Sequence, residues 1–180
     1  MKSITVSGRH SALQFLARAG IIGALYAALT LIVYPLSFGA IQLRFSEVLT
    51  VLPVFFPEAI PGLFAGCAVA NLLSPNIALW DVIFGSLATL MAAICTHCLR
   101  KRPVLAVLPP VIFNALIVGA VITLSESSEQ SFAVLYGMNA LTVGLGEAVI
   151  CLAGGLPLIR VLRKIFVRQP ENPPQQNSHS

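Results

Sequence analysis

The residues most able to do chemistry are two glutamates in strongly apolar surroundings. Glu147 is the one charged residue in the run Gln130–Ile159. Glu47 follows Arg44 by three positions, a spacing that places both side chains on one face if the segment is helical. A charged side chain at membrane depth is energetically costly, so a functional role is the default expectation. The sequence therefore predicts a solute cavity that these carboxylates line, with Arg44 orienting Glu47.

Plainer interpretations of the same residues stay open. Arg44 and Glu47 would also fit an ion pair near the outer membrane surface. Glu147 would also fit a protonated acid that is hydrogen-bonded between helices. Two features favour the cavity. Pro53 and Pro57 interrupt the backbone after Glu47, and irregular backbone at membrane depth is tolerated where it lines a cavity. The glycines around Glu147 leave room for a close neighbour or a ligand.

Three asparagines, Asn71, Asn114 and Asn139, also fall within apolar runs. A single asparagine inside a membrane span usually joins two helices by a hydrogen bond, but three together indicate a polar interior. Trp80 precedes Asp81 at the start of a span, where an aromatic residue and an acid are both common.

Other kinds of site find little support. Cys95, His97 and Cys98 resemble metal ligands, but they crowd into four consecutive positions and lack a second ligand pair. The sequence has no GxxxxGK[ST] loop for ATP, no nucleophile elbow and no HExxH pair. We therefore expect this chain to bind no metal and no cofactor, and to have no enzymatic activity.

Composition indicates which elements must position these residues. Of the 180 residues, 57% are hydrophobic and 10% are charged, and the mean hydropathy is +0.87. A soluble domain is about 45–50% apolar and about 25% charged. The net charge of +4 suits cytoplasmic loops better than a nucleic-acid surface. The chain is therefore predicted to be an all-α integral membrane protein.

Five runs are long enough to cross a bilayer, which takes roughly 20 apolar residues. They are Ala19–Leu43, Ala59–Trp80, Val82–Leu99, Pro103–Ser125 and Gln130–Ile159. Basic residues concentrate at the N-terminus, at Arg100–Arg102 and near the C-terminus, and all three clusters belong in the cytoplasm by the positive-inside rule. Five spans would leave one cluster outside, so the segment from Arg44 to Pro57 must also cross as a short, broken helix, or re-enter.

The predicted architecture thus has six transmembrane helices with both termini in the cytoplasm. Residues 1–16 form a cytoplasmic N-terminal segment, residues 17–168 the membrane domain, and residues 169–180 a disordered cytoplasmic tail rich in proline and polar residues.

The first span carries small residues every four positions, at Gly20, Ala24 and Ala28. This spacing lets another helix approach closely. The sequence does not decide between a helix of a partner subunit and packing against the remaining spans of the same chain.

Longer stretches of sequence resemble a known family. The run 39–53 (GAIQLRFSEVLTVLP) resembles the signature of the QueT-type queuosine-precursor transporters. Four further stretches continue the resemblance in the same order: AIPGLFAGC at 59–67 with ANLL at 70–73, DVIFGSLAT at 81–89, PPVIFNALIVG at 109–119 and VGLGE at 143–147. The similarity extends over roughly residues 24–163.

The resemblance implies the substrate-binding S component of an energy-coupling factor (ECF) importer in the cell membrane. Such a subunit captures a micronutrient outside and works with a membrane coupling subunit, EcfT, and two cytoplasmic ATPases, which use the ATP. The implied cargo is a 7-deazaguanine precursor of queuosine, such as preQ1 or preQ0. The small-residue face of the first helix, here Gly20, Ala24 and Ala28, is implied to meet the coupling subunit.

On this resemblance, the candidate substrate-binding residues are those able to accept hydrogen bonds from a deazaguanine, to orient the acceptors or to stack on the ring. They are Arg44, Glu47, Asn71, Trp80, Asn139 and Glu147. The alternative is a stand-alone secondary transporter of a purine-like or vitamin-like solute, in which protonation of Glu147 drives the cycle.

Overall fold

The protein is described from a computed structural model, which covers residues 6–37, 43–74, 79–126 and 130–167. Within these residues the chain is almost wholly helical and contains no strand, as the composition predicts. The predicted tail, residues 169–180, lies outside the described residues. The first helix begins at Val6, inside the segment 1–16 that was expected to precede the membrane domain.

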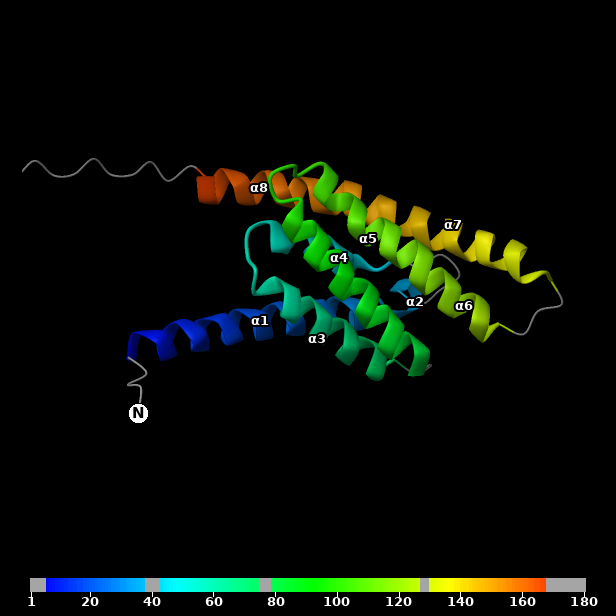
Figure 1. Cartoon of the computed structure of the whole chain (residues 1–180), viewed down its shortest axis with the longest axis horizontal. Coiled ribbons are helices and arrows are strands. Elements are labelled where there is room, and N and C mark those ends of the chain that lie inside the picture. Colours follow the sequence, from blue (N-terminus) through cyan, green and yellow to red (C-terminus); the bar gives the residue numbers. More distant parts are fainter. Residues whose placement is uncertain (1–5, 38–42, 75–78, 127–129, 168–180) are drawn as a thin grey trace, which may run out of the picture.

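Helices of three kinds follow one another along the chain (Figure 1). The regular helices are α1 (Val6–Ile32), α2 (Tyr34–Ser37), α3 (Ala59–Leu72), α4 (Ser86–Cys98), α5 (Leu108–Phe113), α6 (Gly119–Ser125), α7 (Phe132–Ile150) and α8 (Leu156–Val167). The 3₁₀ segments are η1 (Phe45–Val54) and η3 (Leu105–Val107). The π-helical turns are η2 (Asp81–Gly85), η4 (Asn114–Val118) and η5 (Cys151–Gly155).

Helical segments that follow one another directly form longer continuous helices, which we call rods. Four rods are long and apolar enough to cross a membrane. They cover Ser11–Ile32, Asp81–Cys98, Leu105–Ser125 and Phe132–Phe166. Two shorter apolar helices, Phe45–Val54 and Ala59–Leu72, accompany them. The chain is therefore an all-helical protein of the multi-pass membrane type.

The rods run in alternating directions (Figure 1). The N-terminal end of α1, the connection between α4 and α5 and the C-terminal end of α8 lie at one end of the bundle, which we call the basic end. The turn Arg100–Arg102 and the cations Arg160, Arg163 and Lys164 of α8 belong to it. The sequence predicted that these basic clusters share one side of the membrane, and the fold brings them to one end.

The segment predicted to be a short, broken helix is η1. Its backbone is a 3₁₀-helix with Pro53 inside it, and regular 3₁₀-helices of such length are uncommon because their hydrogen bonds are poorer than those of an α-helix. His97 of α4 places Nδ1 2.6 Å from the carbonyl oxygen of Pro53. The histidine that seemed metal-like in sequence thus fastens the end of η1 to α4.

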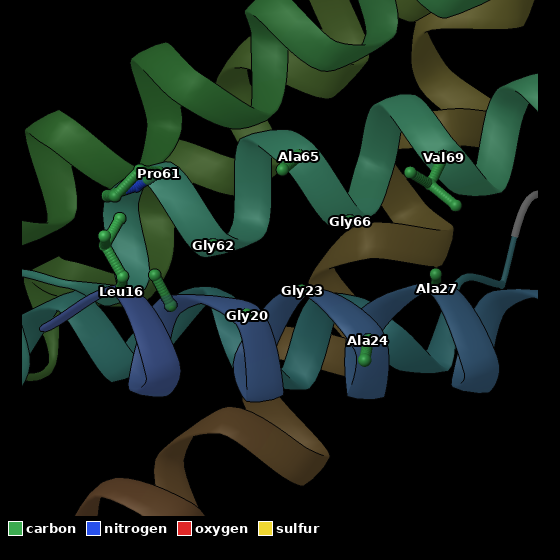
Figure 2. Close-up of a pocket in the computed structure, with 11 residues that line it drawn as sticks. Leu16, Gly20, Gly23, Ala24, Ala27, Pro61, Gly62, Ala65, Gly66 and Val69 are labelled. Carbon is green, nitrogen blue, oxygen red and sulfur yellow. The ribbon is translucent and has the colours of Figure 1, made fainter. Parts of the chain in front are cut away.

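Helices α1 and α3 cross at backbone contact. A Cβ built on Gly66 would lie 2.5 Å from the carbonyl oxygen of Gly23, and one built on Gly62 would lie 2.6 Å from that of Ala19. Real Cβ atoms do not approach backbone so closely, so glycine is needed at both positions. Figure 2 shows Gly62 and Gly66 facing Gly20 and Gly23 across this crossing.

Candidate functional site

Glu47 lies in the first turn of η1 and is fully buried. The hydroxyl of Tyr26, on α1, donates a hydrogen bond to its Oε1. Its other oxygen, Oε2, is buried and has no hydrogen-bond partner among the described residues. The backbone oxygen of Glu47 accepts from the Thr50 hydroxyl at 2.5 Å. The Tyr26 hydroxyl thus holds one of the two carboxylate oxygens in place.

Glu147 shows the same arrangement on α7. It is 1% exposed, and Asn114 Nδ2 donates a hydrogen bond of 3.0 Å to its Oε1. The second oxygen, Oε2, is buried and has no partner within the described part of the chain. Asn114 is the first residue of the π-turn η4, and such turns are common at functional sites because they redirect side chains.

Arg44 belongs to the same polar interior. Its side chain is 2% exposed and its Nε donates to the carbonyl oxygen of Ser37 at 3.4 Å. Arg44, Glu47 and Glu147 lie close enough to interact electrostatically. Arg44 and Glu47 are buried within the protein, which does not fit an ion pair at the outer membrane surface. The cavity that they were expected to line stays a prediction.

The buried atoms without partners are mostly hydrogen-bond acceptors. Among the described residues, four of the six are carboxylate or amide oxygens: Oε2 of Glu47, Oε2 of Glu147, Oδ1 of Asn71 and Oδ1 of Asn114. Buried polar atoms are normally hydrogen-bonded, so a group of unpaired ones calls for an explanation. The oxygens of Asn114 and Glu147 lie together, whereas Asn71 contacts η2.

A comparison with known families finds a match. Residues 16–164 match the sequence model of the QueT transporter family. The chain belongs to the QueT transporter family. No match was found among curated proteins, and none among solved structures. The resemblance read from the sequence motifs is thereby confirmed, and with it a transporter that takes a small-molecule substrate.

The remaining candidate residues of this QueT family member occupy other places. Asn71 Nδ2 donates to the carbonyl oxygen of Asp81 at 2.9 Å and so joins α3 to η2. Asn139 Nδ2 donates to Thr123 Oγ1 at 3.1 Å and so joins α7 to α6. Each makes the helix contact expected of a single intramembrane asparagine, although Asn71 keeps its buried Oδ1 without a partner among the described residues. Substrate contact by either stays a prediction.

Trp80 is 60% exposed and stacks on Phe84, with ring centroids 5.8 Å apart. The two rings line a hollow of about 370 Å³ together with Val121 and Leu124. Its ring contact is therefore with η2 and not with the carboxylates, and its role as a stacking face for the substrate also stays a prediction.

Two residues that touch the carboxylates were not among the predicted site residues. Tyr26 is the lone tyrosine among the aliphatic side chains in the middle of the first span, and a buried tyrosine hydroxyl usually needs a partner. That signal was present in the sequence. Asn114 was recognised only as one of three intramembrane asparagines, and its pairing with Glu147 depends on the π-turn, which the sequence does not reveal.

A shallow groove runs along the α1–α3 crossing of the QueT-family fold (Figure 2). Its volume is about 500 Å³, and small residues form much of its lining, among them Gly20, Ala24, Ala27 and Ala65. Gly20, Ala24 and Ala28 are exposed, whereas the neighbouring Gly23 and Ala27 are buried. Gly23 and Ala27 therefore pack inside the chain. The predicted face, Gly20, Ala24 and Ala28, is not covered by any described residue and is free to contact a partner helix.

Proposed function

We propose that this chain is the substrate-binding S component of an ECF-type importer and takes up a 7-deazaguanine precursor of queuosine. The observation that carries the proposal is the pair of buried glutamates, Glu47 and Glu147, each with one oxygen held and the other without a donor among the residues that the structure describes. The QueT family supplies the class of cargo, and the acceptor-rich interior supplies the chemistry that suits it.

A deazaguanine matches such acceptors. Its pairing edge carries two adjacent N–H donors, which one carboxylate can accept together as a charge-assisted bidentate contact. The aminomethyl group of preQ1 adds a cation that a second carboxylate would receive. The nitrile of preQ0 is itself an acceptor and gains nothing from unpaired acceptors, so the site favours preQ1 over preQ0.

Binding to the purified protein tests the proposal. The panel contains preQ1, preQ0, queuine, guanine and adenine, measured by isothermal titration calorimetry. We expect preQ1 to bind most tightly and adenine not to bind, because adenine presents a different donor pattern and leaves the buried acceptors unpaired. Absence of binding by every deazaguanine would contradict the proposed cargo.

The proposed topology has six membrane passes with the basic end in the cytoplasm of the cell. It is supported by the alternating direction of the rods and by the cations gathered at one end (Figure 1). In this arrangement η1 and α3 complete the six passes although both are short, and residues 1–16 and 169–180 lie on the cytoplasmic side.

The proposed partners are the coupling subunit EcfT and two cytoplasmic ATPases, and the small-residue face of α1 is the proposed contact with EcfT. Its support is the exposure of Gly20, Ala24 and Ala28 beside the groove. Small residues allow the backbones of two membrane helices to approach closely.

Replacing Ala24 with leucine is expected to impair assembly with EcfT and the ATPases while leaving preQ1 binding within about twofold, because the larger side chain enters the exposed groove whereas the carboxylates are buried. Assembly is measured by co-purification and binding by calorimetry. The matched control is Ala153→Leu, the same change at an exposed position of η5, which should leave both unchanged. Loss of preQ1 binding in Ala24→Leu would instead assign this face to internal packing.

The alternative, a proton-coupled secondary transporter, draws on the burial of Glu147 within a membrane helix. Uptake of preQ1 into cells or vesicles separates the two. We expect uptake to cease when ATP is depleted and to persist, for as long as ATP is maintained, in the presence of a protonophore. The reverse result would favour the proton-coupled mechanism.

A further inference from the structure

The hydroxyl of Tyr26 makes the hydrogen bond that fixes Glu47 from α1. We propose that Tyr26 is a positioning residue of the substrate site, which holds one oxygen of Glu47 so that the other is presented to the ligand. The inference rests on the proposed function, since it assigns a role to Tyr26 in the binding of the same cargo.

The surroundings of Tyr26 indicate that it acts through Glu47 and not by touching the ligand. The side chain is 0% exposed and its ring lies in an apolar cluster with Leu49, Leu63 and Cys67. Its hydroxyl is already engaged with the carboxylate. The ring therefore belongs to the core between α1, η1 and α3, and only the hydroxyl reaches the polar interior.

A second hydroxyl of α1 supports the same part of η1. One turn beyond Tyr26, Thr30 Oγ1 lies 2.7 Å from Ser46 Oγ, and it also donates to the carbonyl oxygen of Tyr26 at 2.9 Å. Two consecutive residues of η1, Ser46 and Glu47, are thus attached to α1 by side-chain hydrogen bonds. The position of the first turn of η1, which carries Glu47, is therefore fixed by α1.

The need for such attachment follows from the nature of η1. A 3₁₀-helix has poorer backbone hydrogen bonds than an α-helix, so its backbone positions a side chain less firmly. A glutamate side chain also has several rotatable bonds, whose freedom is lost when it binds a ligand. The Tyr26 hydrogen bond restricts that freedom beforehand, and preorganisation of this kind increases affinity.

A double-mutant cycle tests whether Tyr26 acts through Glu47. The dissociation constant of preQ1 is measured for the wild type, Tyr26→Phe, Glu47→Gln and the double variant. Tyr26→Phe removes only the hydroxyl, and we expect it to weaken binding about tenfold in the wild-type background and less than about twofold in the Glu47→Gln background. An equal loss in both backgrounds, or no loss in either, would overturn the inference.

The control is Tyr136→Phe, which removes a hydroxyl that donates to the Leu116 carbonyl oxygen on another pair of helices and should leave preQ1 binding unchanged.

If the wild type binds no deazaguanine, the proposed function fails, and the inference about Tyr26 is then tested on the ligand-free protein. Thermal unfolding of the same four proteins should show that the loss from Tyr26→Phe is smaller when Glu47 is already replaced. Additive losses in unfolding would overturn it.

Discussion

Replacing Glu147 with glutamine is expected to weaken preQ1 binding at least about tenfold, as is Glu47→Gln. A hydrogen bond to a charged group contributes about 1.5–3 kcal/mol, and tenfold in affinity corresponds to about 1.4 kcal/mol. The substitution keeps the shape of the side chain but removes its charge and turns one acceptor into a donor. An N–H group of the substrate would then face an N–H group of the protein.

Glu147→Gln should leave the ligand-free protein at least as stable to unfolding as the wild type. Asn114 Oδ1, next to Glu147, is buried without a donor in the described structure, and the new amide can supply one. Calorimetry with preQ1 and thermal unfolding without it therefore separate a lost ligand contact from a damaged fold. Glu126→Gln, at an exposed position after α6, is the matched control. Unchanged dissociation constants in both Glu47→Gln and Glu147→Gln would remove the proposed site.

The second large effect is expected at the α1–α3 crossing. Gly66→Ala should destabilise the protein by about 3 kcal/mol, at the upper end of the usual cost of overpacking, because its Cβ would meet the backbone oxygen of Gly23 at 2.5 Å. Backbone cannot move aside as a flexible side chain can. For a chain of this size, such a loss lowers the unfolding midpoint by about 6–12 °C.

Gly20→Ala provides the comparison for this prediction. It introduces the same methyl group on α1 beside the groove, where a Cβ would meet nothing within 4 Å, so its unfolding midpoint should stay within about 2 °C of the wild type. Thermal unfolding in detergent measures both variants. Equal midpoints for the two would show that the helices do not cross as closely as described.

The sequence was sufficient to identify Glu47 and Glu147 as acids inside the helical bundle, because a charged residue stands out in an apolar run, and both are buried. It was also sufficient for the helical fold class and for the shared end of the basic clusters, since charge and hydropathy are properties of segments. The short helix before α3 followed from the parity of the charged loops and not from its own hydropathy, and it does form as η1.

The partners of the carboxylates could not be predicted in the same way. The pairing of Tyr26 with Glu47 and of Asn114 with Glu147 joins helices that are distant in sequence, and it depends on irregular turns that leave no clear pattern. Asn114 and Asn139 have equal standing in sequence, yet Asn114 meets Glu147 whereas Asn139 meets Thr123. Residue type alone does not distinguish a helix contact from a part of the site.

The 3₁₀ form of η1 changes how far its ten residues reach. At about 2.0 Å per residue such a helix extends about 20 Å, whereas an α-helix of equal length extends about 15 Å. This is about two thirds of the thickness of a hydrocarbon layer of about 30 Å. The ten residues of η1 thus extend as far as an α-helix about three residues longer. The number of residues alone therefore underestimates how far a 3₁₀-helix reaches across the membrane.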